Sequence, residues 1–194
     1  MKKTLLFIIP LLGLLLMFCD SPARQQQAVE ETETTLSETE QAFLENLASL
    51  CGKSFRGREV YMQEGRESWA DKELVMHVAV CEETHVHIPF HINDDTSRTW
   101  MFLAEDGRLR FRHDHRHEDG TSEEKTMYGG YSDANGTAYR QHFPADDYTV
   151  ELLTDTLNRQ WNVVMDEQMN TFSYQLLYHG EIVFQADFDL TQPI

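Results

Sequence analysis

From Leu74 onward, apolar residues occupy every second position in one short run after another. This period of two is typical of a β-strand with one buried face, because successive side chains of a strand point to opposite sides. The alternating runs are 74–81, 85–92, 100–104, 109–113, 161–165, 172–178 and 182–190. Turn signals lie at Asn93-Asp94-Asp95, Asp106-Gly107, Asp119-Gly120, Asn135-Gly136 and His179-Gly180. We therefore expect sequential antiparallel strands joined by tight turns.

A long meander with one apolar face removes its exposed edges by closing on itself. We predict an all-β fold, an up-and-down antiparallel barrel of about nine strands. A short helix should precede it, because Ser37-Glu38-Thr39-Glu40 is a capping-box pattern and Gly52 supplies a stop. The apolar face of this helix would consist of Phe43, Leu44, Leu47 and Leu50. The helix would plug one end of the barrel or lie on its wall, and residues 148–153 would form a second short helix or an irregular loop.

The glycine turns also set strand registers. A hairpin centred on Asp106-Gly107 pairs Phe102 with Phe111 and Trp100 with His113. A hairpin centred on Asp119-Gly120 gives the opposite-charge pairs Asp114–Lys125 and Arg116–Glu123. Such cross-strand pairs stabilise a sheet by roughly 0.2–1 kcal/mol each.

The N-terminus carries an export signal. Met1-Lys2-Lys3 precedes an apolar run, Leu5–Phe18, that ends at Cys19. This run is shorter than the roughly 20 residues of a membrane-spanning helix. We predict a signal peptide at 1–18, with Cys19 as the lipidation site of a bacterial lipoprotein. Ordinary signal cleavage after Ala23 and an uncleaved anchor are the alternatives.

The expected domain organisation follows from composition. Residues 19–36 are rich in Gln, Glu and Thr and would form a disordered acidic tether. Residues 37–194 would form a single β-barrel domain. All the readings of the N-terminus place this domain outside the cytoplasm, in the cell envelope as a membrane-anchored lipoprotein or as a secreted protein.

Cys51 and Cys81 remain once Cys19 is set aside. An even pair of cysteines in an oxidising compartment predicts a disulfide. It would close a loop of about 30 residues. The loss of chain entropy in the unfolded state would then stabilise the fold by roughly 3–4 kcal/mol. Two buried free thiols are the alternative.

The formal net charge of −17 argues against binding to nucleic acid. The sequence contains no Gly-x-Ser-x-Gly elbow, no His-Glu-x-x-His and no phosphate-binding glycine loop. We therefore expect a protein that is not an enzyme and needs no cofactor. Its expected partners are a membrane, reached through the lipid anchor, and a small ligand.

The predicted register gathers a candidate ligand site on the inward face. Arg98 would lie opposite His115, and its permanent charge favours an anion over a cation. An apolar floor below these residues would suit a ligand with an apolar body and an anionic head. The residues predicted to bind the ligand are Arg98, Trp100, Phe111, His113, His115 and Tyr128.

Two other functions are compatible with the same pattern. The first is a metal-binding module built from His113, His115 and Glu124, since Glu124 would oppose His115 in the predicted register. An Arg98–Glu124 ion pair would be a purely structural use of the same residues. The second is an envelope interaction protein whose barrel is filled by its own side chains. A hollow interior would favour the ligand site over a packed barrel.

The predicted architecture resembles the calycin group, which comprises the lipocalin and fatty-acid-binding barrels. The chain lacks the Gly-x-Trp motif that opens lipocalins. Five segments resemble a family of small secreted bacterial proteins of uncharacterised function. They are Ile88-Pro89-Phe90-His91, the stretch Asp95–Trp100, His113–Gly120, Tyr128-Gly129-Gly130 and Phe143-Pro144-Ala145-Asp146. The resemblance covers roughly residues 46–194 and implies a common fold and an extracytoplasmic location, with no activity.

A Cys19→Ser variant tests the predicted anchor. We expect it to leave the membrane fraction, because the acylated thiol is the predicted attachment point. Fractionation of cells labelled with a radioactive fatty acid measures both location and acylation. A variant that loses the label but stays with the membrane would indicate an uncleaved anchor.

Overall fold

Eleven strands and two helices make up the part of the chain that the computed structural model describes, residues 35–133, 135–154 and 157–194. The strands are β1 (Ser54–Met62), β2 (Leu74–His77), β3 (Val80–Glu82), β4 (His85–Ile92), β5 (Asp95–Glu105), β6 (Arg108–His115), β7 (Tyr128–Tyr131), β8 (Arg140–Pro144), β9 (Gln160–Met165), β10 (Thr171–Tyr178) and β11 (Glu181–Asp189). The helices are α1 (Glu38–Ala48) and α2 (Asp147–Leu153). The signal peptide and Cys19 lie outside the described residues, as does all but the end of the tether.

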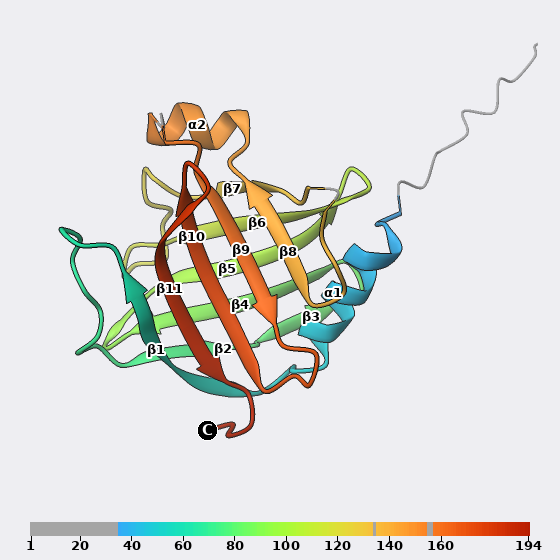
Figure 1. Ribbon diagram of the computed structural model, residues 1–194, viewed down its shortest axis with the longest axis horizontal. Coiled ribbons are helices and arrows are strands. Elements are labelled where there is room, and N and C mark those ends of the chain that lie inside the picture. Colours follow the sequence, from blue (N-terminus) through green and yellow to red (C-terminus); the bar gives the residue numbers. More distant parts are fainter. Residues whose placement is uncertain (1–34, 134, 155–156) are drawn as a thin grey trace, which may run out of the picture. The chain divides into compact units, whose positions relative to one another are not determined.

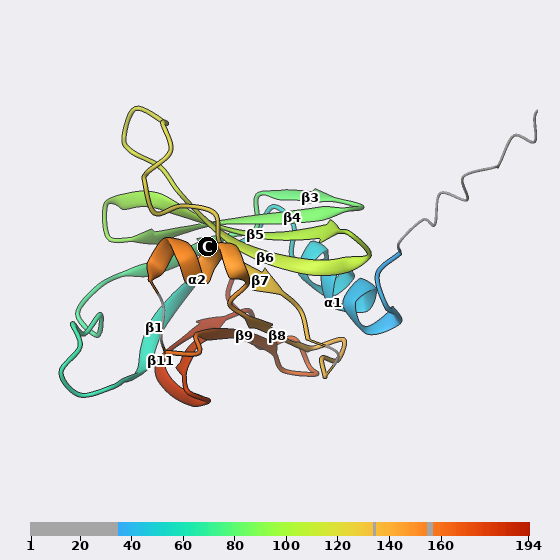
Figure 2. The ribbon, with the colours of Figure 1, turned by 90° about the horizontal axis from the view of Figure 1, so that it is seen from above.

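The strands form a nearly closed barrel. Ten of them pair in the order β7-β6-β5-β4-β2-β1-β11-β10-β9-β8, and β3 pairs with β4 beside this path. All the pairings are antiparallel. β7 and β8 follow each other in the chain and form the two edges of the path (Figure 1, Figure 2). The predicted up-and-down antiparallel barrel is confirmed, with ten strands around it. We call the junction between the edge strands β7 and β8, which do not pair with each other, the seam.

β1 is a strand without an alternating apolar pattern. Phe55 is buried, but the next residue on the same side is Gly57. A Cβ atom on Gly57 would lie 2.5 Å from the ring of Phe188. The ring of the neighbouring strand therefore fills the space of the missing side chain, and the period of two is lost from the sequence.

The predicted register of β5 and β6 is confirmed. Trp100 pairs with His113, Phe102 pairs with Phe111, and Arg98 pairs with His115. The turn residues Asp106 and Gly107 have φ angles of 52° and 70°. Two positive φ angles are what a two-residue hairpin turn requires, and this turn chemistry fixes the register.

The predicted register of the next hairpin is wrong. His113 pairs with Tyr128, two residues beyond the predicted partner. Residues 116–127 form a longer connection, in which His115 donates its N–H to Thr126 Oγ1. Arg116, directly after β6, binds Asp114 of β6, at 2.9 Å between Nε and Oδ2, so the predicted pairs Asp114–Lys125 and Arg116–Glu123 do not form. Glu124 is exposed and does not oppose His115.

Aromatic rings from opposite walls meet inside the barrel. The Trp100 ring of β5 is stacked between Phe90 and Tyr174, with centroids 4.5 and 4.7 Å away. β10, which carries Tyr174, lies halfway around the barrel from β5. Nearer to α1, Phe102 and Phe111 stack at 4.8 Å, and both pack on Phe143 of β8. The interior is therefore packed at these levels rather than hollow.

Helix α1 covers one end of the barrel (Figure 1). Ser37 and Glu40 form the predicted capping box. Phe43 is buried, with its ring 6.0 Å from that of Phe102. The buried Glu40 carboxylate accepts hydrogen bonds from Leu109 N–H, at 3.0 Å, and from the Ser132 hydroxyl. The predicted helix is confirmed, and its apolar face closes the end where β5 turns into β6.

Helix α2 fastens the seam. Its Thr149 hydroxyl accepts from Gly129 N–H at 2.7 Å and donates to Gly129 C=O at 2.8 Å. Its N-cap Asp146 binds Arg112 at 2.7 Å and Arg110 at 3.2 Å, both on β6. Asp146 N–H also donates to Gly129 C=O. These contacts tie β6 and β7 to the chain that follows β8.

The predicted Cys51–Cys81 disulfide is present and joins the segment after α1 to β3. Disulfides are typical of proteins that fold in an oxidising compartment. Within the described residues, neither helix has the length and apolarity that crossing a membrane requires.

Gly130 tests the seam. A Cβ atom there would lie 1.8 Å from the Pro144 carbonyl oxygen, so Gly130→Ala must push β7 away from β8. We expect a loss of about 2 kcal/mol or more in the free energy of unfolding, measured by urea denaturation. A gain of stability would contradict the account, since alanine at an unstrained glycine position usually stabilises. The φ of Gly130 is not positive, so alanine there meets the Pro144 carbonyl without the left-handed backbone strain that Gly65→Ala, at a φ of 85°, would introduce.

Candidate functional site

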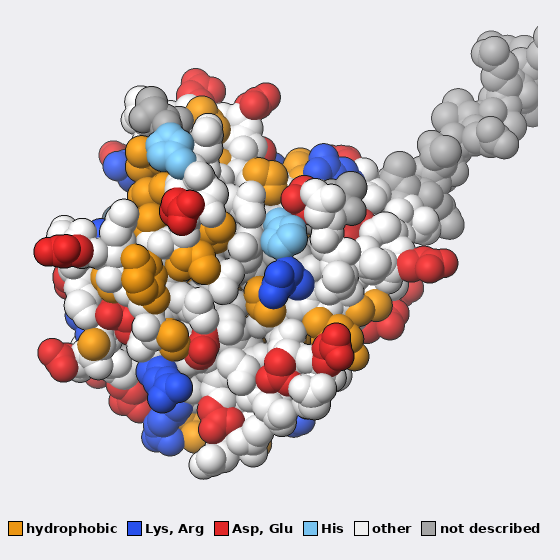
Figure 3. Space-filling view, in the orientation of Figure 1, with side chains coloured by type: hydrophobic (Ala, Val, Ile, Leu, Met, Phe, Trp, Pro, Cys, Tyr) orange, Lys and Arg blue, Asp and Glu red, His pale blue; other side chains and the backbone are white. Residues whose placement is uncertain are grey.

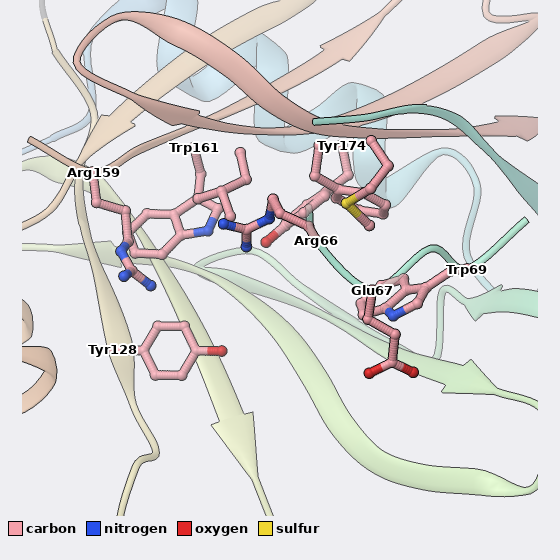
Figure 4. A pocket seen from close by; sticks show the side chains of 10 residues that line it. Arg66, Glu67, Trp69, Tyr128, Arg159, Trp161 and Tyr174 are labelled. Atoms are coloured by element: carbon pink, nitrogen blue, oxygen red, sulfur yellow. The ribbon is translucent and has the colours of Figure 1, made fainter. Parts of the chain in front are cut away.

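The segment between β1 and β2 lies at the end of the barrel opposite α1 (Figure 1). A pocket of about 420 Å³ lies beside this segment (Figure 4). Aromatic rings from five elements line it. They are Trp69 of the segment between β1 and β2, Tyr128 of β7, Trp161 of β9, Tyr174 of β10 and Phe184 of β11. On the face drawn in Figure 3, hydrophobic side chains gather over this end of the barrel, with acidic side chains around them. The pocket is the mouth of a barrel that is packed further in.

Two arginines stand at the pocket. Arg66 comes from the segment between β1 and β2, and Arg159 immediately precedes β9. Their Cζ atoms lie 5.2 and 5.0 Å from the centroid of the Tyr178 ring. Both cations thus interact with one ring, which brings them to the same side of the pocket, next to Trp161 (Figure 4).

The acidic residue of the pocket has its own cation. Glu67 pairs with Lys72, at 2.7 Å between Oε1 and Nζ. The carboxylate of Glu67 lies beside Trp69, away from Arg159 (Figure 4). Because Lys72 offsets Glu67, the positive charge of Arg66 is not cancelled by the acidic residue of the pocket.

Hydrogen bonds hold the Trp69 wall in place. Glu59 of β1 accepts from the Ser68 hydroxyl at 2.9 Å and from Trp69 N–H. The indole of Trp69 packs edge-on against Phe184, with centroids 4.9 Å apart. Contacts within the protein therefore fix this part of the pocket.

His113 lies beneath the pocket floor. Its Nδ1 is 3.2 Å from the Tyr128 carbonyl oxygen, which can only accept, so Nδ1 carries the proton. Burial lowers the pKa of His113 to about 3, and the ring is neutral at pH 7. Its Nε2, 3.0 Å from the Tyr174 hydroxyl, must then accept the hydroxyl proton. Burial also raises the pKa of Tyr174 well above its usual value, so its phenol group stays neutral and donates to His113.

His115 holds the other tyrosine of the pocket. Its Nε2 lies 3.0 Å from the Tyr128 hydroxyl. Burial raises the pKa of Tyr128 to about 12. Burial and the nearby positive charge of Arg98 lower the pKa of His115. Glu123, whose Oε2 lies 3.9 Å from His115 Nδ1, raises it by a smaller amount. Both tyrosines of the pocket are thus neutral and are positioned by histidines.

The six predicted ligand-binding residues occupy four settings. Tyr128 lines the pocket, and His113 and His115 position the two tyrosines from behind. Trp100 and Phe111 belong to the packed interior. Arg98 pairs with Asp95, so the alternative Arg98–Glu124 ion pair does not form. Hydrogen bonds from Ser97 and Arg98 outweigh burial and hold the pKa of Asp95 well below its usual value.

The predicted metal ligands are not brought together. Both nitrogens of His113 are engaged, and the exposed Glu124 does not oppose His115. Within the ranges that the structure describes, no group of three or more His, Cys, Asp or Glu side chains could hold a metal ion.

Sequence reasoning missed most of the pocket, including Arg66, Trp69 and Arg159. The pocket gathers residues from segments that are far apart in the chain and whose contacts depend on barrel closure. One signal was available: Trp69 is a large apolar residue inside the polar stretch Gln63–Glu73. An isolated tryptophan in such a stretch indicates a segment that folds back onto the core.

Comparison of the chain with models of protein families, with curated proteins and with solved structures gives no match. The class of this protein is therefore known only at the level of its fold, a nearly closed antiparallel barrel.

His113 predicts a specific dependence of stability on pH. Its folded-state pKa is below the ordinary value of 6.5, so the unfolded chain binds the extra proton between about pH 6.5 and 3. Stability is full above this window and falls as the pH is lowered through it. His113→Gln keeps an acceptor for Tyr174 but cannot take up a proton, and should flatten the slope by up to about 1.4 kcal/mol per pH unit.

Urea denaturation from pH 7 to pH 4 measures this slope. The exposed His179 supplies the matched control, and His179→Gln should retain the slope of the unmodified protein. An equal slope in the His113 and His179 variants would show that His113 is not held neutral by burial.

Proposed function

We propose that this domain binds a compact, ring-containing small molecule with an anionic group in the pocket opposite α1. The observation that carries the proposal is the combination of five aromatic rings with Arg66 and Arg159 in one pocket of about 420 Å³. Ligand pockets are typically mostly apolar, with a few polar groups that orient the ligand, and run from about 300 to 1,000 Å³. In this proposal the protein binds without catalysis, in line with its lack of catalytic motifs.

The packed interior supports a compact ligand over a long acyl chain. An acyl chain entering from the pocket would have to separate Trp100 from Tyr174, whose rings stack at 4.7 Å with an angle of 7° between their planes. It would also disturb the His113–Tyr174 hydrogen bond. A short molecule can instead stack on Trp161 and Tyr128 without moving the core.

The arginines support an anionic group. No carboxylate in the described part of the chain lies within 4.0 Å of the Arg66 guanidinium, which faces the pocket beside Trp161. A guanidinium binds carboxylate or phosphate oxygens with two parallel hydrogen bonds. The net charge of −17 repels anions at long range, so binding would depend on these short-range contacts.

The location belongs to the same proposal. We propose that the domain works outside the cytoplasm, attached to a membrane through a lipid on Cys19. The Cys51–Cys81 disulfide supports an oxidising compartment. The resemblance to a family of small secreted bacterial proteins points the same way.

Isothermal titration with 2-naphthoate tests the ligand class, with 2-naphthalenemethanol as its uncharged analogue and palmitate as a long-chain anion. We expect 2-naphthoate to bind best. Arg66→Gln should weaken binding about tenfold or more, because a charge-assisted hydrogen bond contributes about 1.5–3 kcal/mol. Arg140→Gln, at an exposed arginine of β8, is the matched control and should bind as the unmodified protein does.

Equal binding of the alcohol would contradict the anionic group, and tighter binding of palmitate would contradict the compact ligand. If none of the three compounds binds, a packed barrel that works through its outer surface becomes the better account.

A further inference from the structure

The outer face of the barrel carries histidines that the proposed ligand site does not use. His77 lies on β2, and His85, His87 and His91 lie on β4. On β4 the histidines alternate with the buried residues Val86, Ile88, Phe90 and Ile92, so their side chains point away from the core. They form two pairs, His77 with His91 and His85 with His87, with ring centroids 4.3 and 4.9 Å apart.

The His77–His91 pair brings two ring nitrogens together. His77 Nε2 lies 3.0 Å from His91 Nδ1. A hydrogen bond between two neutral imidazoles leaves one proton between two nitrogen lone pairs. When the shared proton moves to the other nitrogen of its own ring, both facing nitrogens have a free lone pair, and a divalent metal ion can accept the two.

The two nitrogens are close enough to share one ion. With metal–nitrogen bonds of about 2.0–2.1 Å, neighbouring ligands lie about 2.9 Å apart in a square plane and about 3.3 Å apart in a tetrahedron, so a small rotation of either ring is enough to place an ion between nitrogens that are now 3.0 Å apart. Imidazole sites with water as the remaining ligand are typical of Cu²⁺ and Ni²⁺, and among divalent ions of the first transition row Cu²⁺ binds nitrogen ligands most tightly.

The surroundings hold one ring and tolerate a cation. The Ser54 hydroxyl lies 2.7 Å from His77 Nδ1 and fixes the ring with Nε2 toward His91. Such a second contact commonly orients a metal-binding histidine. Arg56, on the neighbouring β1, pairs with Glu73 at 3.3 Å, which offsets its positive charge. Both histidines are half-buried, so the rings are held while solvent can still reach them.

We propose that His77 and His91 form a surface site for a divalent transition metal ion of the Cu²⁺ or Ni²⁺ type. Two imidazole nitrogens bind the ion, and water completes its coordination. This site is on the outer face of the barrel and differs from the predicted set of His113, His115 and Glu124. It is also independent of the pocket ligand.

The proposal is consistent with the protonation of the pair. Burial and the neighbouring His77 lower the pKa of His91, which favours the neutral ring. The opposing charge of Asp95 is smaller in effect than these two. Neutral imidazole is the form that binds a metal.

Calorimetric titration of the full-length chain with CuCl₂, NiCl₂ and ZnCl₂ at pH 7 tests the site. We expect binding in the order Cu²⁺ above Ni²⁺ and Zn²⁺. His77→Gln and His91→Gln should each weaken Cu²⁺ binding about tenfold or more. His85→Gln changes an outward histidine of the same strand outside the pair and is the matched control. It should leave the affinity unchanged.

Urea denaturation of each variant without metal keeps the test decisive, because it shows that the variants are folded. Electron paramagnetic resonance of the Cu²⁺ complex should report two imidazole nitrogens in the unmodified protein and fewer in each variant of the pair. The proposal is overturned if the unmodified protein binds no Cu²⁺, if His85→Gln weakens binding as much as His77→Gln, or if Zn²⁺ binds more tightly than Cu²⁺.

Discussion

The stack of Phe90, Trp100 and Tyr174 is the contact on which the rest of the structure depends. It joins β4 and β5 to β10 on the far side of the barrel, so that the two walls are in direct contact. Aromatic pairs of this kind contribute about 0.5–1.5 kcal/mol each beyond the area they bury. Their larger consequence is geometric, because a barrel whose walls touch in the middle has no through-channel. A ligand must then be accommodated at an end, and α1 covers one of the two.

The same stack shapes the remaining end. Tyr174 has one face on Trp100, while its hydroxyl bonds to the buried, neutral His113. A partner that cannot ionise near pH 7 keeps this phenol neutral and fixed in direction. The floor of the pocket is therefore rigid and uncharged, and Arg66 supplies positive charge at the rim. An apolar floor with a cationic rim is the arrangement that the proposed function uses.

The fold was predictable from the sequence wherever local chemistry decides it. The alternation and the Asp106-Gly107 turn predicted the β5–β6 register, and the capping box at Ser37 predicted the start of α1. The predicted β6–β7 register was wrong because Asp119-Gly120 lies within a longer connection between the two strands. The predicted cross-strand charge pairs do not form, and Arg116 binds the nearby Asp114 instead. Arg66 could not have been assigned to the pocket, because only barrel closure brings its segment to the start of β9. The predicted site residues Trp100 and Phe111 do face the interior. No pattern in the sequence shows, however, that rings from opposite walls meet there and fill it.

The central claim, that a ligand binds at the mouth and not in the interior, can be tested directly through the three tryptophans of the chain. Trp69 and Trp161 line the pocket, whereas Trp100 is in the packed interior. Nitrogen-15 NMR resolves one indole N–H signal for each. On titration with 2-naphthoate, the account predicts that the signals of Trp69 and Trp161 shift while that of Trp100 stays in place. A shift of the Trp100 signal as large as that of Trp161 would show that the ligand enters the barrel and would contradict the account.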